Sequence, residues 1–146
     1  MDVQRSMRKN LTSYRVIYGD TDQMGVAYYA NYLRWFEIGR TEFLRQTGIP
    51  YTSIEEKGLR FPVTEASCRY LRPARYDEEI SIETTLASLR RVTLTFNYRI
   101  LRQEDGTLIA TGWTKHACVN QEGEVIRIPD DLETLLKAAI SARSDG

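Results

Sequence analysis

Residues 28–47 constrain this chain most, because they predict one long helix that is apolar over most of its surface. The polar positions Asn31, Arg34, Thr41 and Arg45 recur at spacings of three, seven and four residues, so they form only a narrow stripe. A wide apolar arc is formed by Tyr28, Tyr29, Tyr32, Leu33, Trp35, Phe36, Ile38, Phe43 and Leu44. A helix at a protein surface has a narrower apolar face. We therefore expect other structure to enclose most of this helix.

The second half of the chain has the period of a β-strand. Apolar and polar residues alternate strictly over residues 79–86 and 91–100, which predicts antiparallel strands with one buried face. The EDG sequence at 104–106 predicts a hairpin turn, and a further strand follows over 107–120. The sheet is thus expected to be antiparallel and built mainly from consecutive strands.

Two more strands are expected earlier in the chain. Residues 12–18 are rich in β-branched and aromatic types, which favour strands. Residues 60–71 also predict a strand, and Pro62 restricts it to a sheet edge or a strand start because proline cannot donate a hydrogen bond. The chain closes with an amphipathic helix that Asp130 or Asp131 is expected to cap.

This order of elements predicts an α+β fold in which an antiparallel sheet of about five strands wraps around one long central helix. A length of 146 residues fits a single domain over 1–146, with a core at about 12–130 and a C-terminal helix at about 131–142. The curved sheet would leave one face and two edges open, and exposed edges are normally paired or covered. We therefore expect a homodimer or homotetramer.

Composition excludes several classes of function. Twenty basic and twenty acidic residues cancel, which argues against a protein that binds nucleic acid through general phosphate attraction. No stretch reaches the ~18 apolar residues of a membrane span, and residues 1–10 lack the apolar core of a secretory signal. Cys68 and Cys118 match no metal-ligand or redox spacing, so we expect no metal site and two reduced thiols in a cytoplasmic protein.

Two aspartates precede the long helix in the stretch YGDTDQMGVAYYANYLRWFE, which begins at Tyr18. An aspartate ahead of a helix is most often an N-cap or the start of an Asx turn. Asp20 and Asp22 lie six or more residues before residue 28, which is too far for an ordinary cap. The spacing does not distinguish the two aspartates: either can serve the turn before the helix, and one of them is a candidate for chemistry.

The same stretch resembles the signature of hot-dog-fold acyl-CoA thioesterases of the 4-hydroxybenzoyl-CoA thioesterase type, a group that includes the thioesterases of the bacterial Tol–Pal system. That signature has two aspartates one residue apart, a glycine, an apolar and aromatic run, and a closing asparagine–tyrosine pair. Here it is met from Asp20 through Tyr32. The segments RYLRPARYDEEI and TGWTKHACVNQEGEVIRIP also resemble later parts of the family. The resemblance covers about residues 12–130 and implies a hot-dog fold.

The resemblance implies that Asp22 is the catalytic carboxylate and that the backbone N–H of Tyr29 binds the thioester carbonyl. We therefore expect Asp20 to be structural. A helix N-terminus offers unpaired N–H groups and a partial positive charge, which polarise a carbonyl. A carboxylate beside it acts either as a nucleophile or as a general base toward water, and the sequence leaves both roles open. Many Tol–Pal members have histidine at the position of Tyr29, so the tyrosine here favours a mechanism without an imidazole.

Three further residues are candidates for the substrate-binding site near Asp22. Gly25 suits a positive φ or a close approach of the substrate to the backbone. Asn31 either orients the loop through a hydrogen bond or is a solvated helix residue. Tyr28 is a possible substrate contact, although aromatic residues in such a run more often belong to a core or an interface.

Two arginines are candidates for binding the phosphates of coenzyme A. Arg90 and Arg91 lie at a connection between strands, and the arginine fork of N–H donors matches phosphate geometry. Their alternative role is a solvated strand end. His116, the only histidine, is expected to be a structural residue of a strand.

The sequence therefore predicts a thioester hydrolase that converts an aromatic or fatty acyl-CoA into free acid and CoA. It needs no cofactor, because CoA is part of the substrate. Two alternatives remain: a thioesterase acting on acyl-carrier protein, and a hot-dog protein that binds an acyl thioester without turnover, since a fold alone does not establish function.

Overall fold

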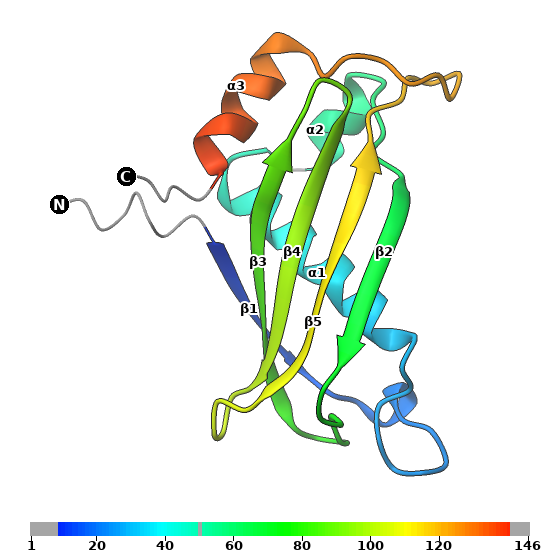
Figure 1. The fold of residues 1–146 in the computed structure, drawn as a ribbon, viewed down its shortest axis with the longest axis vertical. Coiled ribbons are helices and arrows are strands. Elements are labelled where there is room, and N and C mark those ends of the chain that lie inside the picture. The colour runs from blue at the N-terminus through cyan, green and yellow to red at the C-terminus, as the bar shows by residue number, and fades with distance from the viewer. Residues whose placement is uncertain (1–8, 50, 141–146) are drawn as a thin grey trace, which may run out of the picture.

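The computed structural model describes residues 9–49 and 51–140. Its strands form one antiparallel sheet in the order β1-β3-β4-β5-β2, and the sheet curves around helix α1 (Figure 1). The strands are β1 Lys9–Arg15, β2 Val63–Tyr70, β3 Glu79–Leu89, β4 Thr93–Arg102 and β5 Leu108–Ala117. The predicted α+β hot-dog arrangement is confirmed.

Three helices accompany the sheet: α1 Asn31–Gln46, α2 Tyr51–Glu56 and α3 Asp130–Ala139. Helix α1 crosses the inner face of the sheet, whereas α2 and α3 are shorter and lie near the end where β3 and β4 are joined (Figure 1). The prediction of one central helix therefore holds for α1, with two smaller helices beside it. The side chains that α1 buries are Tyr32, Trp35, Phe36, Phe43 and Leu44.

Close packing between α1 and the sheet depends on small residues at the contact. The ring of Phe36 stacks on Tyr98 of β4 at a centroid distance of 4.2 Å. A Cβ atom added to Gly112 of β5 would lie 2.6 Å from ring carbons of Phe36. On the helix side, a Cβ added to Gly39 would collide with Thr84 of β3. Both glycines thus let the helix approach the strands closely.

Strand β2 forms one edge of the sheet and pairs only with β5 among the described residues. Seven of its eight residues are exposed, which agrees with the edge position predicted from Pro62. Its unpaired backbone groups form a row that another strand can join.

Several predicted boundaries are wrong. The first strand was expected over 12–18, but β1 ends at Arg15 because the Ile17 N–H turns to the Asp20 carboxylate. Helix α1 begins at Asn31, three residues after the predicted start at 28. The cap residue of α3 is Pro129, which makes no side-chain cap, and part of the predicted helix over 131–142 lies outside the described residues.

The expectation that α1 is largely enclosed is also wrong for the single chain. One face of the helix is buried against the sheet, while Arg34 and Glu37 are exposed and Leu33 is 42% exposed. The aromatic residues Tyr28 and Tyr29, which were counted in the apolar arc, precede the helix and are 45% and 60% exposed. An apolar surface therefore remains open around the start of α1.

Candidate active site

A buried aspartate closes the loop that connects β1 to α1. Asp20 is only 2% exposed, and its carboxylate accepts hydrogen bonds from the Tyr14 hydroxyl (2.8 Å) and the Ile17 N–H (3.0 Å) and pairs with Arg34. Its carbonyl oxygen accepts a hydrogen bond from the Tyr28 N–H at 2.7 Å. Asp20 therefore fixes both ends of the segment 20–28, and the prediction that it is structural agrees with these contacts.

Asp22 lies within this segment and is exposed. One of its carboxylate oxygens accepts a hydrogen bond from the Met24 N–H at 2.8 Å, which makes an Asx turn. The other carboxylate oxygen has no hydrogen-bond donor among the described residues. Asp22 is thus held in orientation through one oxygen and presents the second to solvent.

Gly25 completes the turn with φ at +80°, and its N–H donates to the Asp22 carbonyl at 3.1 Å. A positive φ is readily adopted only by glycine. Space is open around the position, since a Cβ at Gly25 would meet nothing within 4 Å. The glycine is therefore required by the backbone conformation rather than by crowding.

The backbone that leads into α1 presents unpaired donors. The Tyr28 N–H is used by Asp20, but no described residue accepts a hydrogen bond from the N–H of Tyr29 or Ala30. The carbonyl groups of Tyr28 and Tyr29 already accept from Asn31 (3.0 Å) and Tyr32 (3.3 Å). The Tyr29 N–H is thus available near the N-terminal end of α1, although it lies two residues before the first helical residue.

Aromatic side chains surround this end of the helix. The rings of Tyr28 and Tyr29 lie 4.6 Å apart, and the Tyr70 hydroxyl donates a hydrogen bond to the Tyr29 carbonyl at 3.0 Å. Burial and the neighbouring Cys68 raise the pKa of Tyr70 to about 12, so its hydroxyl keeps its proton at neutral pH. A hollow of about 290 Å³ lies between the rings of Tyr29 and Tyr70 and Leu71.

The Asp22 carboxylate acts electrostatically on Tyr28. The pKa of Tyr28 is raised, first by the side chain of Tyr29 and to a smaller degree by burial and the Asp22 carboxylate. Tyr28 therefore lies within reach of the negative charge of Asp22. Asn31, by contrast, donates its side-chain amide to the Asp20 carbonyl at 2.8 Å, so its observed contact orients the loop.

The two arginines proposed for CoA lie at the other end of the sheet. Arg90 and Arg91 are exposed at the connection between β3 and β4. The Asp22 loop follows Arg15, which pairs with Glu79 at the opposite end of β3. Ten residues of β3 at about 3.3 Å each therefore separate the Asp22 loop from the β3–β4 connection by roughly 30 Å along the strand. The structure does not bring the arginines to Asp22 within one chain.

His116 belongs to a buried hydrogen-bonded chain rather than to the Asp22 loop. The Phe61 carbonyl can only accept, so His116 Nδ1 carries the proton and donates to it at 2.9 Å. Nε2 then accepts from the Thr114 hydroxyl (2.8 Å), which accepts from the Tyr98 hydroxyl (2.6 Å). Burial, with a smaller contribution from Arg40, lowers the pKa of His116 to about 4. The neutral ring fits the structural role that the sequence predicts.

Two features of this site were not found from the sequence. Tyr70, which orients the Tyr29 carbonyl, lies in a segment that predicted only an edge strand. Glu37 and Arg40 have the i,i+3 spacing of a helical ion pair, yet they form no such pair among the described residues, whereas Glu42 and Arg45 do pair at 3.5 Å. Helical spacing alone does not reveal that Arg40 turns toward the sheet, where its guanidinium donates to Tyr98.

Neither a metal site nor a membrane span is found in the described residues. They contain no cluster of three or more His, Cys, Asp or Glu side chains suited to hold a metal ion. None of the helices in 9–49 and 51–140 combines the length and hydrophobicity that a membrane crossing requires.

The curved sheet around α1, with the Asp22 loop ahead of the helix, defines a hot-dog protein. The profile of the thioesterase-like superfamily matches residues 16–136. The acyl-CoA thioester hydrolase YbgC of Escherichia coli is 35% identical over 73% of this chain and 78% of its own length. The chain belongs to the thioesterase-like superfamily.

Other members have similar sequences and structures. The 1,4-dihydroxy-2-naphthoyl-CoA hydrolase of Thermosynechococcus vestitus is 32% identical over 89% of this chain and 90% of its own. The crystal structure of the DHNA-CoA thioesterase from Staphylococcus aureus superposes with a TM-score of 0.83 at 28% identity, covering 89% of this chain and 87% of that one. The family resemblance noted in the sequence is thus confirmed.

Proposed function

We propose that this protein is an acyl-CoA thioesterase that hydrolyses the thioester to a free acid and CoA. One observation carries the proposal: Asp22 presents an oxygen with no donor among the described residues, in the same short loop that ends at the unpaired Tyr29 N–H. A carboxylate and a backbone N–H at a helix start are the two groups that thioester hydrolysis needs.

Two routes are consistent with this pair of groups. In one, Asp22 removes a proton from water, the resulting hydroxide adds to the carbonyl, and the C–S bond breaks to release CoA thiolate, which takes up a proton. In the other, Asp22 itself adds to the carbonyl, thiolate leaves, and water then hydrolyses the mixed anhydride. In both, the Tyr29 N–H donates to the oxyanion of the tetrahedral intermediate.

The named relatives support the substrate class. The relatives described above are an acyl-CoA thioester hydrolase, a naphthoyl-CoA hydrolase and a CoA thioesterase. Hydrolysis of a CoA thioester is common to them, while the acyl group varies. We therefore propose a CoA thioester as the substrate of this protein and infer the acyl group from the shape and lining of its cavities.

We further propose that two chains pair through their β2 edges in a homodimer. The edge is exposed, and apolar side chains accompany it, with Val63 and Tyr70 each 45% exposed. An isologous antiparallel pairing sets the Tyr70 end of one β2 beside the Val63 end of the other. A homotetramer would require a second interface in addition.

This pairing has a consequence for the site. Tyr70 binds the Tyr29 carbonyl, so the Asp22 loop lies at the Tyr70 end of β2. Val63 is the register partner of His116, and the adjacent Ala117 pairs with Thr93, directly after the hairpin that carries Arg90 and Arg91. A two-fold axis through β2 therefore brings the partner subunit's Arg90 and the partner subunit's Arg91 to the end that carries Asp22.

The proposed place of action is the cytoplasm. Cys68 and Cys118 are free thiols, and burial raises the pKa of both, which keeps them protonated and unreactive. Free, unreactive thiols are expected in a reducing compartment.

The test is release of free thiol from a panel of acyl-CoA substrates by the purified protein. Asp22→Asn should lower kcat/KM by about 10²- to 10⁴-fold, the usual range for loss of a general base. Asp105→Asn is the matched control, because Asp105 also accepts a hydrogen bond from the N–H two residues later (3.0 Å) and precedes a glycine with positive φ. Retention of most turnover by Asp22→Asn would remove Asp22 from the mechanism.

A further inference from the structure

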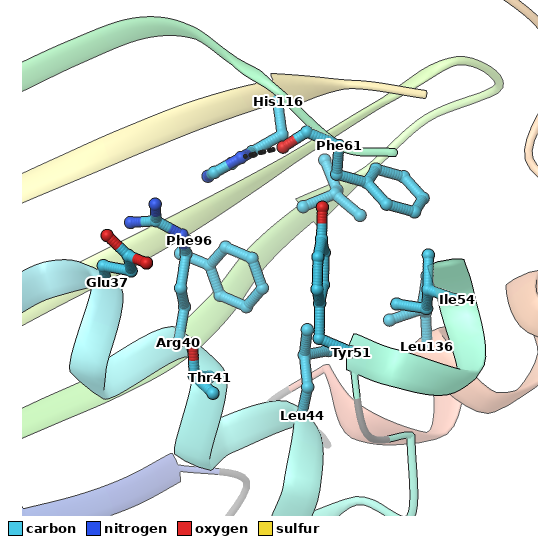
Figure 2. Close-up of a pocket in the computed structure, with 11 residues that line it drawn as sticks. Glu37, Arg40, Thr41, Leu44, Tyr51, Ile54, Phe61, Phe96, His116 and Leu136 are labelled. Carbon is cyan, nitrogen blue, oxygen red and sulfur yellow. Dashed lines mark hydrogen bonds between the residues drawn. The ribbon is translucent and has the colours of Figure 1, made fainter. Parts of the chain in front are cut away.

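A second, more enclosed cavity of about 170 Å³ lies between the second half of α1, helices α2 and α3, and strands β4 and β5. Its interior is lined by Leu44, Ile54, Phe61, Leu94, Phe96 and Leu136. Figure 2 shows the Glu37 carboxylate, the Arg40 guanidinium and the His116 ring gathered on one side, with Leu44, Ile54 and Leu136 on the opposite side. Thr41 and Tyr51 also line the cavity and contribute hydroxyl groups, so the cavity is mainly apolar around Leu44, Ile54 and Leu136 and charged at the opposite side (Figure 2).

Of these polar groups, the Arg40 guanidinium has N–H donors without a hydrogen-bond partner among the described residues. His116 uses both ring nitrogens, for Thr114 and for Phe61. Arg40 makes one long hydrogen bond of 3.5 Å to the Tyr98 hydroxyl and no ion pair with any described carboxylate. A guanidinium has five N–H donors, so most of them are available to an oxygen atom of a ligand.

We propose that this cavity holds the tail of a linear aliphatic acyl group of about six carbons, with Arg40 facing its oxygen-bearing end. The inference rests on the proposed thioesterase function and names its substrate class. The size follows from comparison with an apolar cavity of about 150 Å³ in another protein, which binds benzene. A cavity of 170 Å³ therefore accepts a similar number of carbon atoms.

The lining selects an aliphatic tail over a hydroxylated aromatic one. A hydroxyl carried between Leu44, Ile54 and Leu136 would lose its hydrogen bonds to water, because the charged groups lie on the opposite side (Figure 2) and His116 is already satisfied. Apolar pockets disfavour an added hydroxyl by up to about 100-fold. A dihydroxynaphthoyl group, the acyl group of one relative's substrate, is thus a poor occupant.

The proposed dimer connects this cavity to the catalytic groups. Within one chain, Glu37 lies eight residues beyond Tyr29, or about 12 Å along a helix axis. Pairing of β2 edges places His116, at the Val63 end, near the Tyr29 of the partner subunit. An acyl carbonyl held there can direct its tail into the cavity of the other chain.

Turnover of saturated acyl-CoA substrates of increasing length tests the cavity. We expect kcat/KM to rise by about fourfold per methylene up to roughly six to eight carbons and then to level off. Thr41→Phe, which fills the cavity from a half-buried helix position, should abolish the rise, whereas Arg45→Phe, exposed on the same helix, should not. Tyr51→Ala, which enlarges the cavity, should move the plateau to longer chains. A flat profile, or one that neither cavity variant changes, would overturn the inference.

Binding of octanoate, measured by calorimetry, provides a readout that does not depend on turnover. Wild type should bind octanoate, Thr41→Phe should lose this binding, and Arg40→Gln should weaken it at least tenfold. Equal affinity in all three proteins would overturn the cavity assignment. Octanoate binding without hydrolysis of any acyl-CoA would instead overturn the proposed function and leave the cavity assignment in place.

Discussion

Protonation of His116 should destabilise the fold in a defined pH range. Burial, with a smaller contribution from the charge of Arg40, lowers the pKa of His116 from 6.5 to about 4. The unfolded chain therefore binds a proton near pH 6.5, and the folded chain does not until about pH 4. The stability that the neutral ring contributes is complete above pH 6.5 and is lost as the pH falls from 6.5 to 4.

The size of this effect follows from the shift. A difference of 2.5 pKa units between 6.5 and 4 corresponds to roughly 3 kcal/mol of unfolding free energy, of which about 2.5 kcal/mol is lost by pH 4.5. Protonation would also remove the acceptor at Nε2, so the Thr114 hydroxyl would have to turn away. This loss is a large fraction of the total stability of a small domain.

Urea unfolding followed by tryptophan fluorescence at pH 7.5 and 4.5 measures the effect. His116→Gln is the matched variant, because its amide offers a donor and an acceptor but does not titrate. Carboxylates titrate in both proteins, so only the difference between the two pH dependences reports on residue 116. Between pH 7.5 and pH 4.5, the unfolding free energy of the wild type should fall by about 2.5 kcal/mol more than that of His116→Gln. Equal losses in the two proteins would refute the assignment of a neutral, hydrogen-bonded His116.

Two substitutions test how the site is supported. Gly112→Ala should lower the unfolding free energy by about 1–3 kcal/mol in chemical denaturation, because its Cβ would lie 2.6 Å from Phe36 and still closer to a backbone carbonyl. Gly19→Ala is the control and should leave the unfolding free energy unchanged, because its Cβ would have no contact nearer than 3.9 Å. Asp20→Ala should cost about 3 kcal/mol in the same measurement, since it leaves the Ile17 N–H and the Tyr14 hydroxyl without their acceptor. A neutral result for either would contradict its assigned packing or anchoring role.

The elements governed by local patterns were predicted well. The alternation that includes Ile80 and Leu94 is a property of neighbouring residues, and the strands over these segments form as expected. The start of α1 was missed because tertiary contacts decide it: the Ala27 N–H binds the Ala74 carbonyl and the Tyr28 N–H binds the Asp20 carbonyl. These contacts fix the backbone at Ala27 and Tyr28, so the helix begins at Asn31 although the side chains from residue 28 onward suit a helix.

The candidate site could be predicted only in part. The spacing ahead of the helix was the same kind of evidence for Asp20 and Asp22, and only the family resemblance assigned the chemistry to Asp22. The structure adds that Asp20 is buried and Asp22 exposed. The positions of Arg90 and Arg91 could not be foreseen, because sequence shows a strand connection but not which end of the sheet it occupies. The cavity beside Arg40 depends on three helices and two strands at once, so no local pattern indicates it.

The central claim is that one catalytic site combines Asp22 of one subunit with Arg90 and Arg91 of the partner subunit. Mixing the inactive Asp22→Asn protein with the Arg90→Ala/Arg91→Ala protein, followed by unfolding and refolding together, tests it directly. Half of the refolded dimers are hybrids, and each hybrid has one of its two sites intact, so the mixture should recover about a quarter of the wild-type thiol release. A mixture that remains as inactive as its two components would contradict the claim.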